Sequence, residues 1–178
     1  MIATERLVLR PWEDRDCVPY AAMLAEPHMI EFLGPVVANG AQSVMDRHIG
    51  YRTSHGLGFW AVERRADGAL LGQCGLKPGG ERTPIAGMLE IGWALGSVGL
   101  GQGFAVEAAR ASLTWAWANR SEDEVVAITS AINTRSRAVM ERLGMTHDPA
   151  ATFDHPAVAD DSSLKRHIIY RIARPAER

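Results

Sequence analysis

The stretch 96–113, GSVGLGQGFAVEAARASL, constrains the fold most, because four glycines fall within eight residues just before an alanine-rich run. Glycine costs conformational entropy, so such a cluster indicates a backbone that takes positive φ or approaches another group closely. The following apolar residues recur three and four positions apart, which predicts an amphipathic helix. A helix N-terminus has unpaired N–H groups and about half a positive charge, so this junction predicts an anion-binding site.

Two familiar nucleotide-binding motifs do not fit this loop. A P-loop needs a lysine and a hydroxyl after its last glycine, but Gln102 and Gly103 follow Gly101. A Rossmann fingerprint needs a third glycine where Phe104 stands, and an acidic residue about 20 positions further on, which is missing. A nucleoside triphosphatase is therefore excluded and a dinucleotide-dependent oxidoreductase is disfavoured. A glycine-rich connector without a ligand stays open as an alternative.

The bulk properties predict one cytoplasmic domain over residues 1–178. The chain is 47% hydrophobic and 22% charged with a net charge of -2, which indicates neither a nucleic-acid nor a membrane partner. Cys17 and Cys74 lie far apart in the sequence, which suits a reducing compartment. The first residues contain no apolar signal segment. The six histidines lack metal-ligand spacing, so no metal site is predicted.

Hydrophobic periodicity and turn residues predict a mixed α+β chain without repeats or linkers. Strands are expected at 6–12, 58–65, 69–76, 88–95, 124–132, 146–153 and 165–173. Helices are expected at 14–24, 41–56, through 105–117 and at 133–145, and the segments 34–40, 77–87 and 154–163 are expected to be loops.

The glycine loop has a parallel in a known family. GLGQGFAVEA, residues 99–108, resembles the acyl-CoA pyrophosphate loop Gln/Arg-x-x-Gly-x-Gly/Ala of the GNAT superfamily of N-acetyltransferases. Gly103 and Ala105 match its last two defined positions, whereas Leu100 departs from the first. The opening of the chain, TERLVLRPW, and the strand LEIGW, residues 89–93, are also similar to the family, in its order and spacing.

A second motif points to one branch of that superfamily. NTRSRAVMERLGM, residues 133–145, is similar to the Asn-x-x-Ser…Glu-x-x-Gly-Phe helix of the bacterial ribosomal-protein alanine acetyltransferases, the RimJ/RimL type. The matching residues are Asn133, Ser136, Glu141, Leu143 and Gly144, while Met145 replaces the usual Phe.

The resemblance implies a GNAT fold and acetyl-CoA as co-substrate, without a metal. That fold has a mostly antiparallel central sheet of about six to seven strands, flanked by about four helices and splayed in the middle for coenzyme A. The implied coenzyme-binding residues are Trp93, Ala94, Leu95, Leu100, Gly101, Gln102, Gly103, Phe104, Ala105, Asn133 and Ser136.

The implied reaction is direct attack of a neutral primary amine on the acetyl thioester in a ternary complex. Glu90 is the candidate base and Ser136 the candidate proton donor to the leaving sulfur. The alternatives are a solvated or ion-paired Glu90 and a Ser136 that bonds the helix backbone. Asn133 fits both an N-cap and a hydrogen bond to the pantetheine arm. Gly92 fits either a bulge that admits the ligand or a tight contact with a helix.

The acceptor is a small-molecule or peptide amine whose identity the sequence leaves open. Candidate lining aromatics are Trp60, Trp93, Phe32, His155 and Tyr170. Asp154, Asp160 and Asp161 could attract a cationic amine, although charged loops are usually only solvated. A homodimer stays open, and the alternative function is a non-catalytic acyl-CoA-binding module of the same fold.

Overall fold

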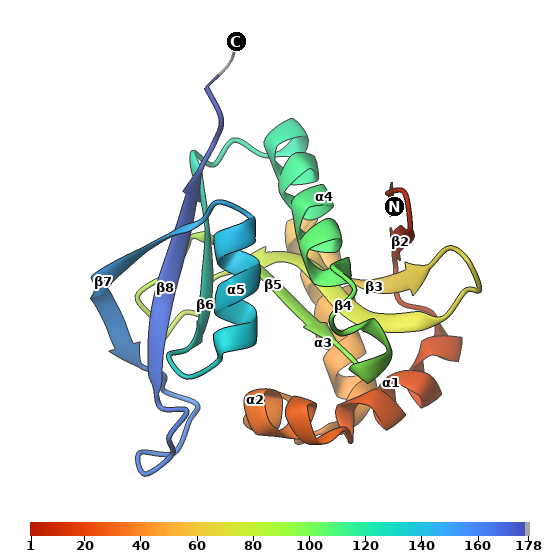
Figure 1. Cartoon of the computed structure of the whole chain (residues 1–178), viewed down its shortest axis with the longest axis horizontal. Helices are drawn as coiled ribbons and strands as arrows, with labels where there is room; N and C mark the ends of the chain where they lie inside the picture. Colours follow the sequence, from red (N-terminus) through yellow and green to blue (C-terminus); the bar gives the residue numbers. More distant parts are fainter. Residues whose placement is uncertain (177–178) are drawn as a thin grey trace.

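The computed structural model of the chain describes residues 1–33 and 38–176, together with the backbone of residues 34–37 (Figure 1). Its strands are β1 (Ile2–Ala3), β2 (Leu7–Arg10), β3 (Gly58–Arg64), β4 (Leu70–Pro78), β5 (Leu89–Leu95), β6 (Glu124–Ser130), β7 (Thr146–Asp154) and β8 (Arg166–Ala173). Its helices are α1 (Cys17–Leu24), α2 (Pro27–Val37), α3 (Gly40–His55), α4 (Phe104–Asn119) and α5 (Thr134–Arg142), with short 3₁₀ turns η1 (Asp14–Asp16) and η2 (Ser97–Gly99).

Within the described residues, eight strands form one sheet in the order β1-β2-β3-β4-β5-β6-β8-β7. Every neighbouring pair is antiparallel except β5 and β6, which are parallel. A parallel pair needs a crossover connection, and α4 supplies it between β5 and β6. The predicted mixed, mostly antiparallel sheet is confirmed.

Four details of the prediction are wrong. The described sheet has eight strands rather than six or seven, because the two-residue strand β1 is too short to show a period. The described helices number five rather than four, because α2 begins at Pro27, a residue that also marks turns but is tolerated at a helix start. Lys77 and Pro78 belong to β4 rather than to the following loop. The predicted loop 34–40 shortens to residues 38–39, because α2 continues to Val37 and α3 begins at Gly40; the side chains of residues 34–37 lie outside the described residues.

Helices cover both faces of the sheet. α4 and α5 lie in front of it in Figure 1, and the main apolar core fills the space beneath them with residues such as Leu7, Leu76 and Leu113. α1, α2 and α3 pack on the other face around a second core that includes Tyr20, Met45 and Ala94. The alternation of β5 therefore sends Ala94 to the α1–α3 face and its neighbour Leu95 to the α4 face.

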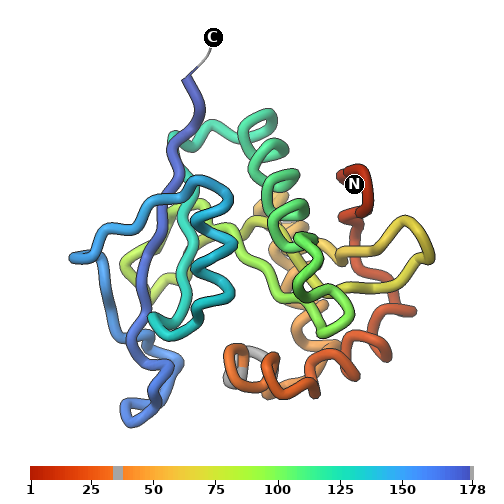
Figure 2. The backbone as a smooth tube through the Cα atoms, in the orientation of Figure 1, coloured from red at the N-terminus to blue at the C-terminus, as the bar shows by residue number. Residues whose placement is uncertain are grey.

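The sheet divides into two halves that meet at β5 and β6. β5 pairs with β6 at Glu90 and Val126, and beyond this point the two strands diverge. We call the diverging segments, residues 91–95 and 127–130, the fork. In Figure 2 the chain after residue 120 forms the left half, and the loop 79–88 crosses from β4 to reach it. Ile85 of this loop packs on Val126 and Ile169, so the loop covers β6 and β8 beside the fork.

Two helix ends agree with the sequence pattern. α3 ends at Gly56, which takes φ 67°, and Gly144 follows α5 with φ 83°. Both are the left-handed conformation that glycine supplies at helix C-termini. Over residues 1–176, no helix combines the length and the apolar character that a membrane span needs.

Candidate active site

The glycine loop begins α4 at the open end of the fork. Gly101 has φ 73° and Gly103, the N-cap of α4, has φ 80°, so both occupy the left-handed region. No side chain caps the helix, and its first N–H groups have no acceptor within the helix. These N–H groups together with the helix dipole make an anion-binding geometry that needs no cationic side chain.

The glycines in this stretch have different structural reasons. A Cβ at Gly101 would meet nothing within 4 Å, so this position needs glycine for its φ and not for space. A Cβ at Gly96 would lie 2.5 Å from Cγ of Met23, so Gly96 lets α1 approach the loop. At Gly99 the nearest atom would be Cβ of Leu95 at an ordinary 3.4 Å. Of these glycines, Gly101 and Gly103 are therefore the two that the backbone conformation at the start of α4 requires. The sequence pattern alone does not separate them from Gly96 and Gly99.

Arg6 is a residue of this site that the sequence analysis missed. Its Nη1 donates to the carbonyl of Gln102 at 3.1 Å, and its guanidinium lies 4.5 Å from the ring centroid of Phe104. Glu107 holds Arg6 in place through an ion pair of 2.6 Å and also accepts a hydrogen bond from Thr4. Burial alone would raise the pKa of Glu107, but the hydrogen bonds from Thr4 and Arg6 lower it. Arg6 thus fixes the loop from the far end of the chain.

A hollow of about 400 Å³ lies next to this contact. Its lining residues are Glu5, Arg6, Arg64, Arg65, Ala66 and Phe104. Arg64 pairs with Asp67 at 2.7 Å, and Nη1 of Arg65 donates to the carbonyls of Thr4 and Glu5. Arg64 and Arg65 therefore have partners away from the start of α4, and Arg6 is the basic side chain of this hollow that contacts the glycine loop.

The register of β5 directs backbone groups into the fork. The N–H of Gly96 donates to Leu71, so the even-numbered residues of β5 face β4. Because backbone groups of a strand alternate between its two sides, those of Trp93 and Leu95 face β6. The carbonyl of Leu95 accordingly contacts Nε2 of His28 on α2 at 3.0 Å. The resemblance implies coenzyme binding by Trp93, Ala94 and Leu95, but the backbone groups of Ala94 point toward β4 rather than into the fork.

Gly92 makes room for an aromatic ring rather than for a bulge. The register between β4 and β5 continues unshifted from Gly72–Leu95 to Pro78–Leu89. A Cβ at Gly92 would lie 2.6 Å from Cζ of Phe59, a residue of β3. Neither the predicted bulge nor the predicted helix contact is present. The β4–β5 pairing has no bulge at Gly92, and the close neighbour of Gly92 is the side chain of Phe59, two strands away, rather than a helix.

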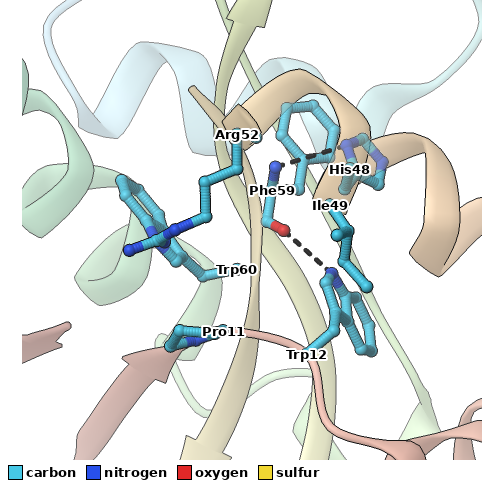
Figure 3. A pocket seen from close by; sticks show the side chains of 8 residues that line it. Pro11, Trp12, His48, Ile49, Arg52, Phe59 and Trp60 are labelled. Carbon is cyan, nitrogen blue, oxygen red and sulfur yellow. Dashed lines mark hydrogen bonds between the residues drawn. The ribbon is translucent and has the colours of Figure 1, made fainter. Parts of the chain in front are cut away.

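Phe59 is held in this position from the edge of the sheet (Figure 3). Its carbonyl accepts a hydrogen bond from Nε1 of Trp12 at 2.9 Å, and its N–H donates to Nδ1 of His48 at 3.3 Å. The His48 ring stacks on the Phe59 ring at 4.5 Å. Burial lowers the pKa of His48 to about 3, so it is neutral and able to accept this bond. The hollow around them has a volume of about 150 Å³.

Glu90 lies at the base of the fork, opposite Val126. It is 7% exposed and forms an ion pair with Lys77, its cross-strand neighbour on β4. Burial raises the pKa of Glu90, and the Lys77 ammonium opposes this rise. The side chain is therefore ion-paired and not solvated, with a higher proton affinity than an exposed glutamate.

Asn133 and Ser136 lie on the other side of the fork, where β6 turns into α5. Asn133 is 9% exposed and its Oδ1 accepts the N–H of Ser136 at 3.1 Å. The predicted N-cap is therefore confirmed. The hydroxyl of Ser136 is half-buried and has no hydrogen-bond partner among the described residues. No hydrogen bond from this hydroxyl to the helix backbone is present among the described residues, and the role of Ser136 stays a prediction.

Several predicted acceptor residues lie elsewhere. Trp60 and Tyr170 are 5% and 3% exposed and belong to the core on the α4–α5 side, where Tyr170 donates to Glu141. Phe32 and Trp93 are half-buried, and Trp93 packs against that same core. His155 is half-buried near His167, at a centroid distance of 4.7 Å. Trp60 and Tyr170 are thus core aromatics, because they point to the opposite face of the sheet from Glu90.

The acidic loop is largely neutralised. Asp154 pairs with Arg166 at 3.0 Å and Asp160 with Lys165 at 2.8 Å, while Asp161 is exposed. Two of the three predicted attractants of a cationic amine therefore already have cationic partners.

Comparison with known proteins agrees with this geometry. The profile of the acetyltransferase (GNAT) domain matches residues 6–146. The acetyltransferase of Agrobacterium tumefaciens str. C58 is 30% identical, with a TM-score of 0.76 over 96% of this chain and 92% of that one. YkkB of Bacillus subtilis (strain 168) is 27% identical over 146 residues, which are 81% of this chain and 84% of that protein. RimJ of Mycobacterium smegmatis, solved in complex with CoA-disulfide, shares the fold at 20% identity and a TM-score of 0.72, over 94% of this chain and 81% of that one.

The forked sheet and the uncapped helix start define the class as an acetyltransferase fold. The chain belongs to the GNAT acetyltransferase family, and its structural neighbours include RimJ.

Proposed function

We propose that this protein is an acetyl-CoA-dependent N-acetyltransferase that acts on a primary amine, either a protein N-terminus or a small molecule. The observation that carries the proposal is the fork itself, since β5 and β6 separate just after Glu90 and Val126. The uncapped start of α4 lies at its open end, and Asn133 begins α5 on its other side. The fork thus lies between the uncapped helix start and the segment that carries Asn133 and Ser136.

The coenzyme would occupy this fork in an extended form. The N–H groups at 103–106 would bind its pyrophosphate, with the small side chain of Ala105 leaving the backbone accessible. The backbone of Trp93 and Leu95 would pair with the pantetheine arm in place of the missing strand neighbour. Asn133 would add a side-chain hydrogen bond while it caps α5. Leu100, Gln102 and Phe104 would contribute the shape of the loop.

Two side chains would handle the protons of the transfer. The lone pair of the amine forms the C–N bond at the thioester carbonyl, and the C–S bond breaks with its electron pair on sulfur. Glu90 would take the proton that the nitrogen loses, directly or through water, and the raised pKa of this buried carboxylate suits that role. Ser136 would donate to the departing sulfur, for which its partnerless hydroxyl is available.

The acceptor that fits this chemistry best is a weakly basic amine. An α-amino group has a pKa of about 7.7–8.0 and a lysine about 10.4, so the α-amino group is far more often neutral near pH 7. A base as modest as Glu90 therefore suffices for an α-amino acceptor, whereas a lysine would need more help. We accordingly place a protein N-terminus or an amino-acid-like amine before a polyamine or an aminoglycoside.

Two measurements on one preparation test the proposal. Coenzyme A and acetyl-CoA should both raise the melting temperature by similar amounts, because both would share the loop and the fork. Ligand at about 100 times its Kd stabilises by about 2.7 kcal/mol. Thiol release from acetyl-CoA, assayed over a panel of amines, then separates an enzyme from a non-catalytic coenzyme-binding module. A flat melting temperature across the titration would refute the coenzyme assignment.

A further inference from the structure

The Ser130 hydroxyl is buried without a partner. Ser130 is 5% exposed, and its Oγ makes no hydrogen bond to any of the described residues. An unsatisfied buried hydroxyl is costly, and most buried polar side-chain atoms in proteins have a partner. Neither the fold nor the proposed chemistry has used this group so far. A ligand that bonds the hydroxyl would remove the cost.

Ser130 lies on the β6 arm of the fork, on the face of the sheet that also carries Glu90 and Ala94. It is four residues beyond Val126, just as Ala94 is four residues beyond Glu90. At about 3.3 Å per residue, each lies about 13 Å past the last paired position, on the two separate arms of the fork. Even spacing keeps Ser130 on the face of Val126, and Ala94 on the face of Glu90. Both therefore belong to the face of the sheet that α1–α3 cover, opposite to α4 and α5.

His167 is the direct cross-strand neighbour of Ser130. Directly opposed side chains of an antiparallel pair share one face of the sheet. Nδ1 of His167 lies 3.2 Å from the carbonyl of Lys165, so it must be the donor in that bond. Nε2 of the neutral ring then carries a free lone pair. Burial lowers the pKa of His167 below its usual value, which keeps the ring in this accepting form.

The surroundings favour an uncharged nitrogen at this position. The carboxylates of Glu90, Asp154 and Asp160 already pair with cationic side chains. Burial and the charges of Lys77, Lys165 and Arg82 lower the pKa of His155, whose ring lies beside His167. An ammonium ion would find no free carboxylate among these groups. A neutral amine would find two hydrogen-bond acceptors, Oγ of Ser130 and Nε2 of His167.

We propose that Ser130 and His167 form the subsite that binds the neutral acceptor amine, by accepting hydrogen bonds from its N–H groups. The subsite rests on the proposed N-acetyltransferase function, and it adds residues that face the nitrogen rather than the coenzyme. The lone pair of the amine stays free to attack the thioester while its N–H groups are held. Ser130 and His167 bind and orient the amine, and its proton reaches Glu90, about 13 Å nearer the base of the fork, through a chain of water molecules.

A bisubstrate probe tests the subsite without knowledge of the natural acceptor. In this probe a CH₂–C(=O) bridge joins the sulfur of coenzyme A to the nitrogen of alaninamide. Calorimetry gives its Kd and that of coenzyme A for the wild type, Ser130→Ala and His167→Gln. The loss of one hydrogen bond typically weakens binding about tenfold. The bridging nitrogen of the probe keeps one N–H, so we expect that loss for the probe in at least one of the two variants, with the Kd of coenzyme A unchanged in both.

Two matched variants control for the loss of a buried group. Ser112→Ala removes a buried hydroxyl on α4 that bonds the carbonyl of Ala108. His147→Gln removes a ring on β7 that stacks on Tyr170, on the opposite face of the sheet. Both should keep the ratio of the two Kd values. If Ser130→Ala and His167→Gln also keep it, the subsite is refuted. If wild-type protein does not bind coenzyme A, the proposed function itself has failed.

Discussion

The two sides of the fork are built in different ways. On the coenzyme side, a short continuous segment from β5 to α4 presents backbone N–H and C=O groups, with glycines that allow the required φ values. On the proposed acceptor side, the Lys77–Glu90 pair joins β4 to β5 and the Ser130–His167 pair joins β6 to β8, so the residues come from distant parts of the sequence. The comparison teaches that, under the proposed function, binding of the co-substrate would depend on local geometry, whereas positioning of the acceptor would depend on tertiary contacts.

The largest effect should follow from a change on the coenzyme side. Gly103→Val forces a β-branched residue into φ 80° at the start of α4 and displaces the N–H groups there. Losing two charge-assisted hydrogen bonds weakens binding by about a hundredfold or more, so the Kd of coenzyme A should rise that far. Calorimetric titration measures it.

The control for this variant is Gly144→Val at the far end of α5. Gly144 has φ 83° and, like Gly101, nothing within 4 Å of its Cβ position, so it suffers the same backbone strain away from the loop. Both variants should lose about 1–2 kcal/mol of unfolding free energy, and only Gly103→Val should lose the coenzyme. Wild-type affinity in a folded Gly103→Val protein would contradict the assignment of the loop.

Ser136→Ala tests the arm of the fork that begins α5. A hydrogen bond to sulfur strengthens only as negative charge builds up there, so the hydroxyl would serve the transition state more than the bound thioester. A thiolate is a tolerable leaving group, so kcat should fall by only about ten- to a hundredfold. The KM for acetyl-CoA should stay nearly unchanged. Full kcat together with a lowered melting temperature would remove Ser136 from the mechanism.

Glu90→Gln tests the acceptor side. Near pH 7 the rate should fall by about tenfold or more, and the loss should shrink as pH rises, because more of the amine is then already neutral. A pH series of kcat/KM measures this trend. Glu124→Gln is the matched control, since Glu124 is the first residue of β6, before the fork begins, and forms a 2.7 Å ion pair with Arg171. An equal loss at every pH would assign Glu90 to binding rather than to proton transfer.

The smallest effect concerns the His48 contact that holds Phe59 over Gly92. The pKa of His48 is about 3 in the folded protein and about 6.5 in the unfolded chain. Between these values the unfolded state binds more protons, so the free energy of unfolding falls as pH falls below about 6.5. The slope from this group is at most about 1.4 kcal/mol per pH unit. His48→Gln should flatten it, whereas the exposed His55→Gln on the same helix should not. Denaturant unfolding between pH 4 and 7 measures the slopes, and equal slopes in all three proteins would contradict the account.

The coenzyme side was largely predictable because its information is local. The strand, the glycines and the helix start of this side, like the Asn133 cap across the fork, each lie within a short window, where spacing and turn chemistry determine the backbone. Gly99 shows the limit of predicting backbone conformation from the glycine pattern. It lies among glycines of positive φ, but its own φ is not positive. Arg6 shows another, because nothing in the sequence says that its side chain reaches Gln102.

The acceptor side was poorly predictable because it depends on strand order and facing. Trp60 and Tyr170 are aromatic residues of the kind that often line binding sites. Side chains alternate between the two faces of a strand, and those of Trp60 and Tyr170 face the α4–α5 core. The Lys77 partner of Glu90 was placed in a loop, and β8 inserts between β6 and β7, which brings His167 next to Ser130. Pairings of this kind are set by the whole sheet, so a local pattern cannot predict them.

The central claim, that backbone amides on the coenzyme side bind coenzyme A, is tested most directly by amide hydrogen exchange with and without coenzyme A. The amides at 103–106, together with Trp93 and Leu95, should exchange more slowly in its presence. Ala94, which faces β4, should change little. Thermal stabilisation by coenzyme A with no added protection at 103–106 or at Trp93 would contradict the account, because the ligand would then bind elsewhere on the molecule.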